Sequence, residues 1–342
     1  RESEPEPAPI GHPGPRRAAC TADAVKAEGL AAVFLATPHD VAMELSPVML
    51  SAGAKVVDLS AAFRLETGEN YQRWYKEPHT QPELLKEAVY SIPEFHRAKV
   101  PTARLISNPG CYPTAANLAI RPLVEAGAFV REAGIVCDSK SGVSGAGRKA
   151  SLKTSFCEVT ENFSAYSILD HRHVPEVLKN SGLEESEFSF TAQLIPIDRG
   201  ILETIFFRAT SVVKSTSDLI DLYLAKYREE PFVRVYPQGA VPDLHAVNHT
   251  NFCAIGAKMD PKTGRAVVVS AIDNLGKGAA GQAIQNANIM CGFQENYGLT
   301  TTGVSFRGIY PFTVYGLDSG FKYPLQKLLS LLSLIGILPI GV

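Results

Sequence analysis

One cysteine stands where the local sequence favours a reactive thiol. Cys111 lies in the stretch S-N-P-G-C-Y-P-T, in which Pro109 and Pro113 restrict the backbone and Gly110 permits close approach of a ligand. A short strand is expected before this turn, and a helix after Pro113 that ends at Gly127. The helix dipole would lower the pKa of the thiol and favour the nucleophilic thiolate. A buried structural thiol, the more common role of cysteine, is the alternative.

Two histidines are spaced to act together. His171 and His173, in D-H-R-H-V-P-E, would lie on one face of an extended segment, with Arg172 on the other. One imidazole could transfer a proton while the other binds an anion. The segment lacks the third ligand and the carboxylate that would indicate zinc, so no metal site is predicted. Surface or structural histidines are the alternative interpretation.

Other candidates are groups that could hold an anion. The stretch SGVSGAGRK, residues 141–149, combines three glycines, two serines and two cations, and free backbone N–H groups there could hold an oxyanion or phosphate. Its glycine order does not fit G-x-G-x-x-G, and a plain glycine-rich hairpin is equally compatible. Arg64 and Arg199 could each bind a carboxylate or phosphate, or be ordinary surface charges.

The elements that must position these residues are typical of an α/β fold. Apolar runs ending near Thr37 and at Ser60 predict two buried strands, joined by a helix that closes on Gly53. A strand–helix–strand unit favours a parallel sheet. A final helix is expected after Asp273. Between these parts, one helical run, SDLIDLYLAKYREE, and four strand candidates, GIVCDSKS, FSFTAQLIPI, ILETIFFRAT and GRAVVVSAI, predict a strand-rich second domain.

Composition narrows the class of partner. The 342 residues, 45% hydrophobic and 20% charged, suffice for two domains, and the net charge of -2 gives no reason to expect a nucleic-acid partner. A small molecule is the expected partner. Six scattered cysteines without a C-x-x-C pair favour a reducing, cytoplasmic setting.

The two ends of the chain differ from its middle. Residues 1–29 are rich in proline and charge and predict a disordered leader without a secretion signal. The apolar stretch Leu328–Val342 is shorter than the roughly 18 residues that span a bilayer, so no membrane partner is predicted.

Several stretches, taken in order, resemble the N-acetyl-gamma-glutamyl-phosphate reductase family, relatives of the aspartate-semialdehyde and glyceraldehyde-phosphate dehydrogenases. The resemblance runs from about Ala31 to Leu299, and NPGCYPT together with SGVSGAGRK makes it specific. The other matching stretches are FLATPHDVAMEL, VVDLSAAFRL, YSIPE, SFCEVTENFSAY, HRHVPEV, PIDRGILETI and DNLGKGAAGQAIQNANIMCGF.

The resemblance implies a fold and a reaction. The fold would be α/β: a Rossmann-like parallel-sheet domain over residues 30–112 and 270–299, and an inserted α+β mixed-sheet catalytic domain over 113–269. The reaction would be the NADPH-dependent reduction of N-acetyl-gamma-glutamyl phosphate, an acyl phosphate, to N-acetylglutamate semialdehyde with release of phosphate. Cys111 would form a thioester that hydride reduces.

The resemblance also implies roles for other residues. His171 would carry the proton and His173 would contact the substrate, although the pattern alone does not decide between them. A homo-oligomer, dimer or tetramer, is implied as well. Substrate contacts would come from Arg64, Ser141, Ser144, Gly145 and Arg199, and cofactor contacts from Thr37, Pro38, Asn274 and Lys277.

The chain departs from this family at both ends. The family's first strand and glycine-rich turn, roughly G-A-S-G-Y-x-G, are expected to be missing, because only about thirty residues precede the stretch FLATPH. Residues 300–342 form an atypical tail. Three alternatives therefore stay open: an enzyme like aspartate-semialdehyde dehydrogenase, a non-catalytic remnant that lacks cofactor binding, and a thioester hydrolase using Cys111 and His171.

Overall fold

The first of two sheets is a parallel four-stranded sheet. The computed structural model describes residues 20–147 and 151–299. Helix α2 (His39–Ser51) connects the first two strands and is followed by Gly53, whose φ of 91° is in the left-handed region that favours glycine. The strand–helix–strand unit predicted from the sequence is confirmed. The order in the sheet is β1 (Ala32–Leu35), β2 (Lys55–Asp58), β4 (Leu105–Ser107) and β3 (Val89–Tyr90).

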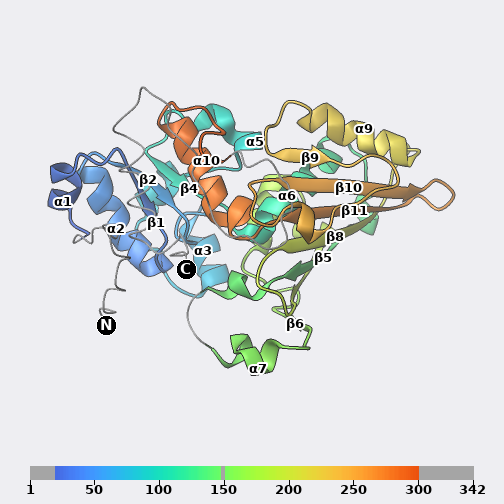
Figure 1. Ribbon diagram of the computed structural model, residues 1–342, viewed down its shortest axis with the longest axis horizontal. Coiled ribbons are helices and arrows are strands. Elements are labelled where there is room, and N and C mark those ends of the chain that lie inside the picture. Colours follow the sequence, from blue (N-terminus) through green and yellow to red (C-terminus); the bar gives the residue numbers. More distant parts are fainter. Residues whose placement is uncertain (1–19, 148–150, 300–342) are drawn as a thin grey trace, which may run out of the picture.

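Helices cover both faces of this sheet, as Figure 1 shows. Alternate side chains of each strand point to opposite faces, so both faces carry apolar residues. Val33 and Val56 pack with α1 (Ala22–Ala27) and α2. Phe34 and Val57 pack instead against α10 (Gly281–Met290). Within the described residues β1 forms one edge of the sheet, paired only with β2.

Helix α1 corrects one expectation. Residues 20–29 were assigned to a disordered leader, but residues 22–27 are helical. The Thr21 side chain accepts a hydrogen bond from the Ala24 N–H, and Val25 is buried against the core beside α2. Capping and one buried side chain outweigh the charged composition of this short stretch. Residues 1–19 of the predicted leader and the tail 300–342 lie outside the described residues.

The second sheet is mixed and has seven strands. Strands β5 and β7 are parallel, as are β9 and β10, and the other neighbouring pairs are antiparallel. An α/β chain with one parallel and one mixed sheet was predicted, and this fold class is confirmed. The order is β6 (Ser164–Tyr166), β7 (Phe188–Leu194), β5 (Ile135–Ser141), β8 (Ile201–Arg208), β11 (Arg265–Ile272), β10 (Cys253–Asp260) and β9 (Val233–Val235).

Among the described residues, the α-helices that pack on the mixed sheet share one face, while the short 3₁₀ helix η6 (Leu244–Ala246) covers part of the other face at Ala254 and Ala271. Helices α6 (Cys111–Glu125), α8 (Val174–Ser181) and α9 (Thr216–Tyr227) share a core with the inward-facing side chains of its strands. On the opposite face Val136 is 45% exposed and Phe206 43% exposed. Large apolar side chains exposed on one sheet face are a feature of association surfaces.

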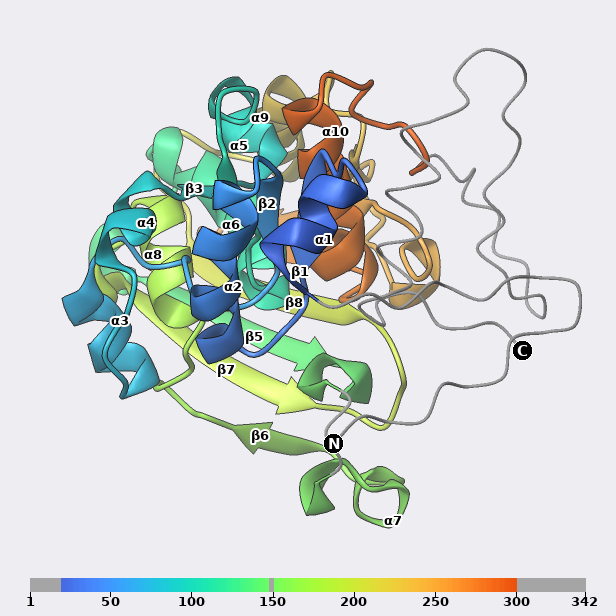
Figure 2. The same cartoon turned by 90° about the vertical axis from the view of Figure 1, so that its left-hand side faces the viewer.

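The remaining helices are short and lie in the connections. No helix of the described residues is long and apolar enough to cross a membrane. Figure 2 shows α7 at the margin of the molecule, next to β6, the edge strand of the mixed sheet. These helices are α3 (Gly68–Tyr75), α4 (Pro82–Glu87), α5 (Pro93–His96) and α7 (Phe156–Val159).

Candidate active site

Cys111 is the first residue of α6, and this differs from the predicted start of the helix after Pro113. Proline is compatible with the first turn because the N–H groups there have no partner within the helix. The helix can therefore begin three residues earlier than predicted. The expected position of Cys111 at a strand-to-helix turn is confirmed, since β4 ends at Ser107.

The turn before Cys111 is packed too closely for a larger residue than glycine. A Cβ placed on Gly110 would lie 2.6 Å from Nε2 of His173. On the other side, a Cβ placed on Gly278 would lie 2.9 Å from the Cβ of Cys111. The backbone around the thiol is thus held between an imidazole ring and the chain that precedes α10.

The two histidines come together, but not on an extended segment as predicted. His173 has αR geometry, with φ -86° and ψ -11°, at the N-cap of α8. Its backbone N–H donates to Nδ1 of His171 at 3.2 Å, which is a local turn, and the two ring centroids are 4.8 Å apart. His171 packs edge-on against Tyr112 and Tyr166. The two histidines therefore meet through a turn instead of a strand face, and they contact the residues on either side of Cys111, Gly110 and Tyr112.

A buried cluster of charged and polar groups supports this arrangement. The guanidinium of Arg64 is 3.3 Å from Oε1 of Glu176 and donates through Nε to the Asn108 carbonyl at 3.0 Å. The other carboxylate oxygen of Glu176 accepts the Gly110 N–H at 2.9 Å and the Tyr90 hydroxyl at 3.1 Å. Glu176 thus connects the turn before Cys111 to Arg64.

Glu176 and Tyr90 were not among the residues singled out from the sequence. Glu176 stands three residues after His173 on a helix, a spacing that brings the two side chains to one face. The distance from its Oε1 to His173 Nε2 is 3.9 Å. This three-residue spacing from His173 could have identified Glu176 from the sequence. Tyr90 had none, because its contact depends on the packing of β3 beside α8.

Burial sets the protonation of the central groups. It raises the pKa of the Cys111 thiol to about 11, although Arg64 and the Tyr112 N–H act in the opposite direction. Burial also lowers the pKa of His171 to about 4 and that of His173 well below its usual value. The expected lowering of the thiol pKa by the helix dipole is therefore wrong for the protein without ligand. The thiol and both imidazoles are therefore neutral at neutral pH.

The glycine-rich loop after β5 was expected to offer free backbone N–H groups, and this expectation is wrong for Gly142, Val143 and Ser144. Their N–H groups donate to the carbonyls of Gly200, Ile197 and Asp198. These bonds hold the loop, which forms the 3₁₀ turn η3 (Val143–Ala146), against the segment that precedes β8. Residues 148–150 lie outside the described residues.

The predicted substrate residues of this loop are bonded to the segment before α10. The Ser144 hydroxyl donates to Asp198 O at 2.7 Å and accepts from Asn274 Nδ2 at 3.0 Å. Asn274 Oδ1 accepts the Gly200 N–H at 2.8 Å. A Cβ on Gly145 would lie 2.9 Å from the Ser141 hydroxyl. The structure thus brings Ser141, Ser144, Gly145 and Asn274 together.

Arg199 is held beside the same segment. Its Nη1 is 3.1 Å from Oδ2 of Asp273, whose carboxylate is completely buried. Asp273 Oδ1 accepts the N–H groups of Leu275 and Gly276. Arg199 therefore has a fixed partner and a defined position, in contrast to a free surface charge.

Lys277 is placed differently from the other predicted cofactor residues. It is fully buried, and its Nζ lies 2.7 Å from both Glu94 Oε1 and Gln285 Oε1. Its ammonium group is thus engaged inside the protein. Pro38 is exposed at the N-cap of α2, and Thr37 immediately precedes it.

The carboxyl edge of the parallel sheet carries polar groups without partners. Thr37 Oγ1, Asp58 Oδ2 and Ser107 Oγ are buried and have no hydrogen-bond partner among the described residues. Asp58 ends β2 and Ser107 ends β4, and the two residues are paired in register. Burial raises the pKa of Asp58 to about 6. Unpaired buried groups at this edge fit a polar ligand, since ligands of parallel α/β sheets bind outside the carboxyl ends of the strands.

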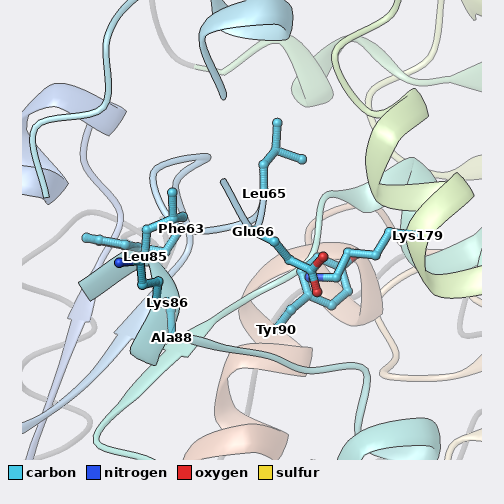
Figure 3. A pocket seen from close by; sticks show the side chains of 8 residues that line it. All are labelled: Phe63, Leu65, Glu66, Leu85, Lys86, Ala88, Tyr90 and Lys179. Atoms are coloured by element: carbon cyan, nitrogen blue, oxygen red, sulfur yellow. The ribbon is translucent and has the colours of Figure 1, made fainter. Parts of the chain in front are cut away.

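A cavity of about 260 Å³ lies behind the polar cluster, and Cys111 does not line it. Figure 3 shows Glu66 and Lys179 meeting at the Tyr90 ring. Their charged groups are 2.9 Å apart. The cavity shares only Tyr90 with the cluster around Glu176. Within the described part of the chain, no group of histidine, cysteine and acidic residues could hold a metal ion.

Comparison with known proteins agrees with this geometry. A model of the semialdehyde dehydrogenase NAD-binding domain matches residues 12–103, and one of the semialdehyde dehydrogenase dimerisation domain matches residues 111–274. Among solved structures, an aspartate semialdehyde dehydrogenase II from Vibrio cholerae aligns with a TM-score of 0.59 at 16% identity. It covers 76% of this chain and 79% of that chain. That likeness supports the fold.

Sequence relatives identify the family. An N-acetyl-gamma-glutamyl-phosphate reductase of Citrifermentans bemidjiense is 49% identical over 80% of this chain and 79% of its own length. The reductase of Symbiobacterium thermophilum is 48% identical over 80% of each chain. The resemblance noted from the sequence is confirmed, and the chain belongs to the N-acetyl-gamma-glutamyl-phosphate reductase family of oxidoreductases.

Proposed function

We propose that the protein reduces N-acetyl-gamma-glutamyl phosphate to N-acetylglutamate semialdehyde, with NADPH as reductant and phosphate as the leaving group. The observation that carries the proposal is Cys111 at the N-terminus of α6, beside two neutral histidines and the Arg64–Glu176 pair. Relatives at 48% and 49% identity bear the name of this activity. The likeness to aspartate semialdehyde dehydrogenases, at 16% identity, favours that alternative less.

The first half of the proposed reaction forms a thioester. His171 takes the proton of the Cys111 thiol, because its neutral imidazole can accept one and the thiol is protonated at neutral pH. The sulfur attacks the acyl carbon, the bond from that carbon to the phosphate oxygen breaks, and phosphate leaves. Arg64, Arg199 and Ser144 are the proposed contacts for the anionic substrate, and His173 contacts it from the adjacent turn.

The second half releases the aldehyde. NADPH supplies a hydride to the thioester carbon when it is bound. The carbon–sulfur bond then breaks, and His171 returns the proton to the sulfur of Cys111. The N–H groups of Cys111 and Tyr112 at the start of α6 would stabilise the negative charge on the carbonyl oxygen during both halves.

The proposed cofactor site is the carboxyl edge of the parallel sheet. Thr37 and Pro38 lie at the end of β1, next to the unpaired oxygens of Asp58 and Ser107. These groups fit a nucleotide that carries several hydroxyl and phosphate oxygens. Asn274 would approach the nicotinamide end, since it lies beside Ser144. Lys277 is left out of this site because Glu94 and Gln285 already bind its ammonium group.

Replacement of Cys111 by serine tests the proposal. We expect Cys111→Ser to lower kcat about 10³-fold or more in phosphate-dependent NADP reduction with N-acetylglutamate semialdehyde. Cys157→Ser, which changes an exposed thiol, is the matched control and should keep full activity. A rate in Cys111→Ser close to wild type would reject the thioester mechanism.

Titration separates the enzyme from the alternatives. Micromolar NADPH binding by Cys111→Ser, measured calorimetrically, supports the reductase, whereas no binding at millimolar concentration supports a non-catalytic remnant. Release of N-acetylglutamate without any nicotinamide cofactor would indicate the hydrolase. The same titration with NADH tests the preference for NADPH.

We further propose that the protein assembles through the open face of the mixed sheet. Val136 and Phe206 are exposed there, and the domain model that matches residues 111–274 describes a dimerisation domain. Phe206→Glu should weaken association about tenfold or more in sedimentation equilibrium, because it places a charge in an apolar interface. Val212→Glu, at a residue 57% exposed outside the sheet, is the control. Unchanged association of Phe206→Glu would exclude this face.

The proposed setting is the cytoplasm. All six cysteines are free thiols, although two of them are exposed. Free thiols and a cysteine nucleophile suit a reducing compartment.

A further inference from the structure

The chain between β11 and α10 forms a π-helical turn, η7 (Gly276–Ala280). Its bonds from Gly278 N to Asp273 O, at 2.9 Å, and from Ala280 N to Leu275 O, at 3.0 Å, each span five residues. Single π turns are rare and occur frequently at functional sites. This turn lies next to Cys111, and the segment just before it contacts the loop that carries Ser144.

Glycines fit the turn tightly against its neighbours. A Cβ on Gly276 would lie 2.3 Å from the Thr250 carbonyl oxygen, and one on Gly281 would lie 2.3 Å from Asn251 Oδ1. A Cβ on Gly278 would lie 2.9 Å from the Cβ of Cys111. A shift of η7 toward or away from α6 would therefore move the Cys111 side chain or open a gap beside it.

The charge at the centre of the turn is buried. Lys277 and Glu94 are both 0% exposed as side chains, and their charged atoms are 2.7 Å apart. Gln285 Oε1 accepts from Lys277 Nζ at 2.7 Å and from Asn251 Nδ2 at 3.1 Å. The ion pair thus connects η7 to α5, to α10 and to the segment before β10.

Stability alone does not account for a buried ion pair of this kind. Removing two charges from water offsets most of their attraction, so a buried ion pair often contributes little to the free energy of unfolding, while its directional bonds fix one arrangement of the chain. The residues just before η7, Asp273 and Asn274, hold Arg199 and Gly200. The segment of η7 therefore adjoins the glycine-rich loop after β5 on one side, through Asn274 and Ser144, and Cys111 on the other.

We propose that Lys277 and Glu94 are positioning residues that hold η7 against Cys111 and so set the direction in which its thiol meets the acyl carbon. The inference rests on the proposed role of Cys111 as nucleophile. It differs from a cofactor role for Lys277, because the pair acts on the reacting sulfur through Gly278 and makes no contact with NADPH.

The test is the double variant Glu94→Gln/Lys277→Met, which removes both charges and keeps side chains of similar length. We expect kcat to fall tenfold or more, with KM for acyl phosphate and for NADPH each within threefold of wild type. The control is Arg104→Met/Glu87→Gln, which removes an exposed ion pair of 2.8 Å and should leave both constants unchanged. Thermal unfolding confirms that each variant is folded.

The outcomes are separable. If the folded double variant keeps kcat within twofold of wild type, the positioning role of Lys277 and Glu94 is overturned. The role of Cys111 as nucleophile is tested separately, and it still stands if Cys111→Ser is inactive. An increase of KM for NADPH above tenfold with unchanged kcat would overturn it in favour of a cofactor contact. Should the double variant not fold, Gly278→Ala tests the same contact with the charges kept, and wild-type kcat in that variant would overturn the proposal.

Discussion

The thiol and the two imidazoles of the site are uncharged in the protein without ligand. Burial is the dominant cause for all three groups: it raises the pKa of Cys111 and lowers those of His171 and His173. A protonated thiol is a weak nucleophile, but it is also protected from oxidation. In the proposed mechanism, activation of the thiol requires proton transfer to an imidazole when the acyl phosphate is in place.

This protonation state can be measured by alkylation. With a pKa of about 11, the thiolate fraction of Cys111 should rise about tenfold per pH unit from pH 7 to pH 10. The rate of modification by iodoacetamide, followed by peptide mass, should rise in proportion. Cys20 and Cys157 are exposed and are first changed to serine. A rate that levels off by pH 8 would show that the thiol is already ionised.

The proposed reacting residues could be singled out from the sequence more readily than the residues that contact them. Cys111 and the two histidines were recognisable because their immediate neighbours carry the signal. Glu176 accepts the Gly110 N–H across 66 positions of the chain and the Tyr90 hydroxyl across 86. Its spacing from His173 could have indicated Glu176, but no short motif could indicate Tyr90. The shift in the pKa of Cys111 was predicted in the wrong direction, because a position at a helix N-terminus does not indicate how deeply the thiol is buried.

Among the elements, the start of α6 depends on one glycine. Gly110→Ala would place a methyl group 2.6 Å from His173 Nε2, so the ring or the turn must shift. A displacement of about 1 Å at a reacting group can lower the rate about 100-fold, and we expect a loss of about tenfold to 100-fold in kcat. Gly68→Ala, at the start of α3 with no atom closer than 4.0 Å, is the control.

Steady-state kinetics of both variants check this prediction, with thermal unfolding to confirm that they are folded. Equal activity of Gly110→Ala and Gly68→Ala would mean that the position of His173 against the turn does not matter. A loss confined to Gly110→Ala would support the close packing of ring and thiol.

Apolar periodicity predicted most of the elements but not their irregular parts. Helices α2 and α9 and the strands β1, β2, β4, β5, β7, β8 and β11 follow from helical spacing and short apolar runs. Strands β3, β6, β9 and β10 were not predicted. The turn at His173 and the π turn η7 do not, since both depend on tertiary contacts. The final helix was expected directly after Asp273, whereas regular α-helix begins at Gly281.

At the scale of the whole molecule, a carboxyl group is enclosed in the mixed sheet. Glu203 on β8 is 0% exposed, accepts a hydrogen bond from Ser139 at 3.0 Å, and its other oxygen has no partner among the described residues. Burial raises its pKa to about 8, although Ser139 acts in the opposite direction. In the unfolded chain it would ionise near pH 4.5.

The sign of the pH effect follows from these values. The folded state keeps the proton that the unfolded chain loses, so the contribution of Glu203 to stability is complete below about pH 4.5 and is lost as the pH rises to about 8. Glu203→Gln cannot ionise. Its free energy of unfolding relative to wild type should therefore increase between pH 5 and pH 8, by at most about 1.4 kcal/mol per pH unit.

Urea unfolding at several pH values measures this difference. The slope with pH, and not the difference at one pH, carries the prediction, because the buried amide changes stability by a constant amount. If plots of the unfolding free energy against pH are parallel for Glu203→Gln and wild type, Glu203 has the same pKa in the folded and unfolded states.

The two-sheet organisation could be predicted, but the order of strands in the mixed sheet could not. Alternating apolar residues indicate strands without saying which strands are neighbours. Strand β6, for instance, pairs with β7 although α8 separates them in the chain, and its burial is slight. The open face at Phe206 was not predicted either.

The helix that begins at Cys111 depends on later parts of the chain for its own hydrogen bonds. Pro122 lacks the N–H that would normally bond to the Leu118 carbonyl, and the Tyr227 hydroxyl donates to that carbonyl at 2.6 Å instead. Ser270 likewise donates to the Ala115 carbonyl. A ribosome must therefore add more than a hundred residues after Leu118 before Tyr227 can bond to this carbonyl, so the last hydrogen bonds of α6 form only after much of the mixed sheet has been synthesised.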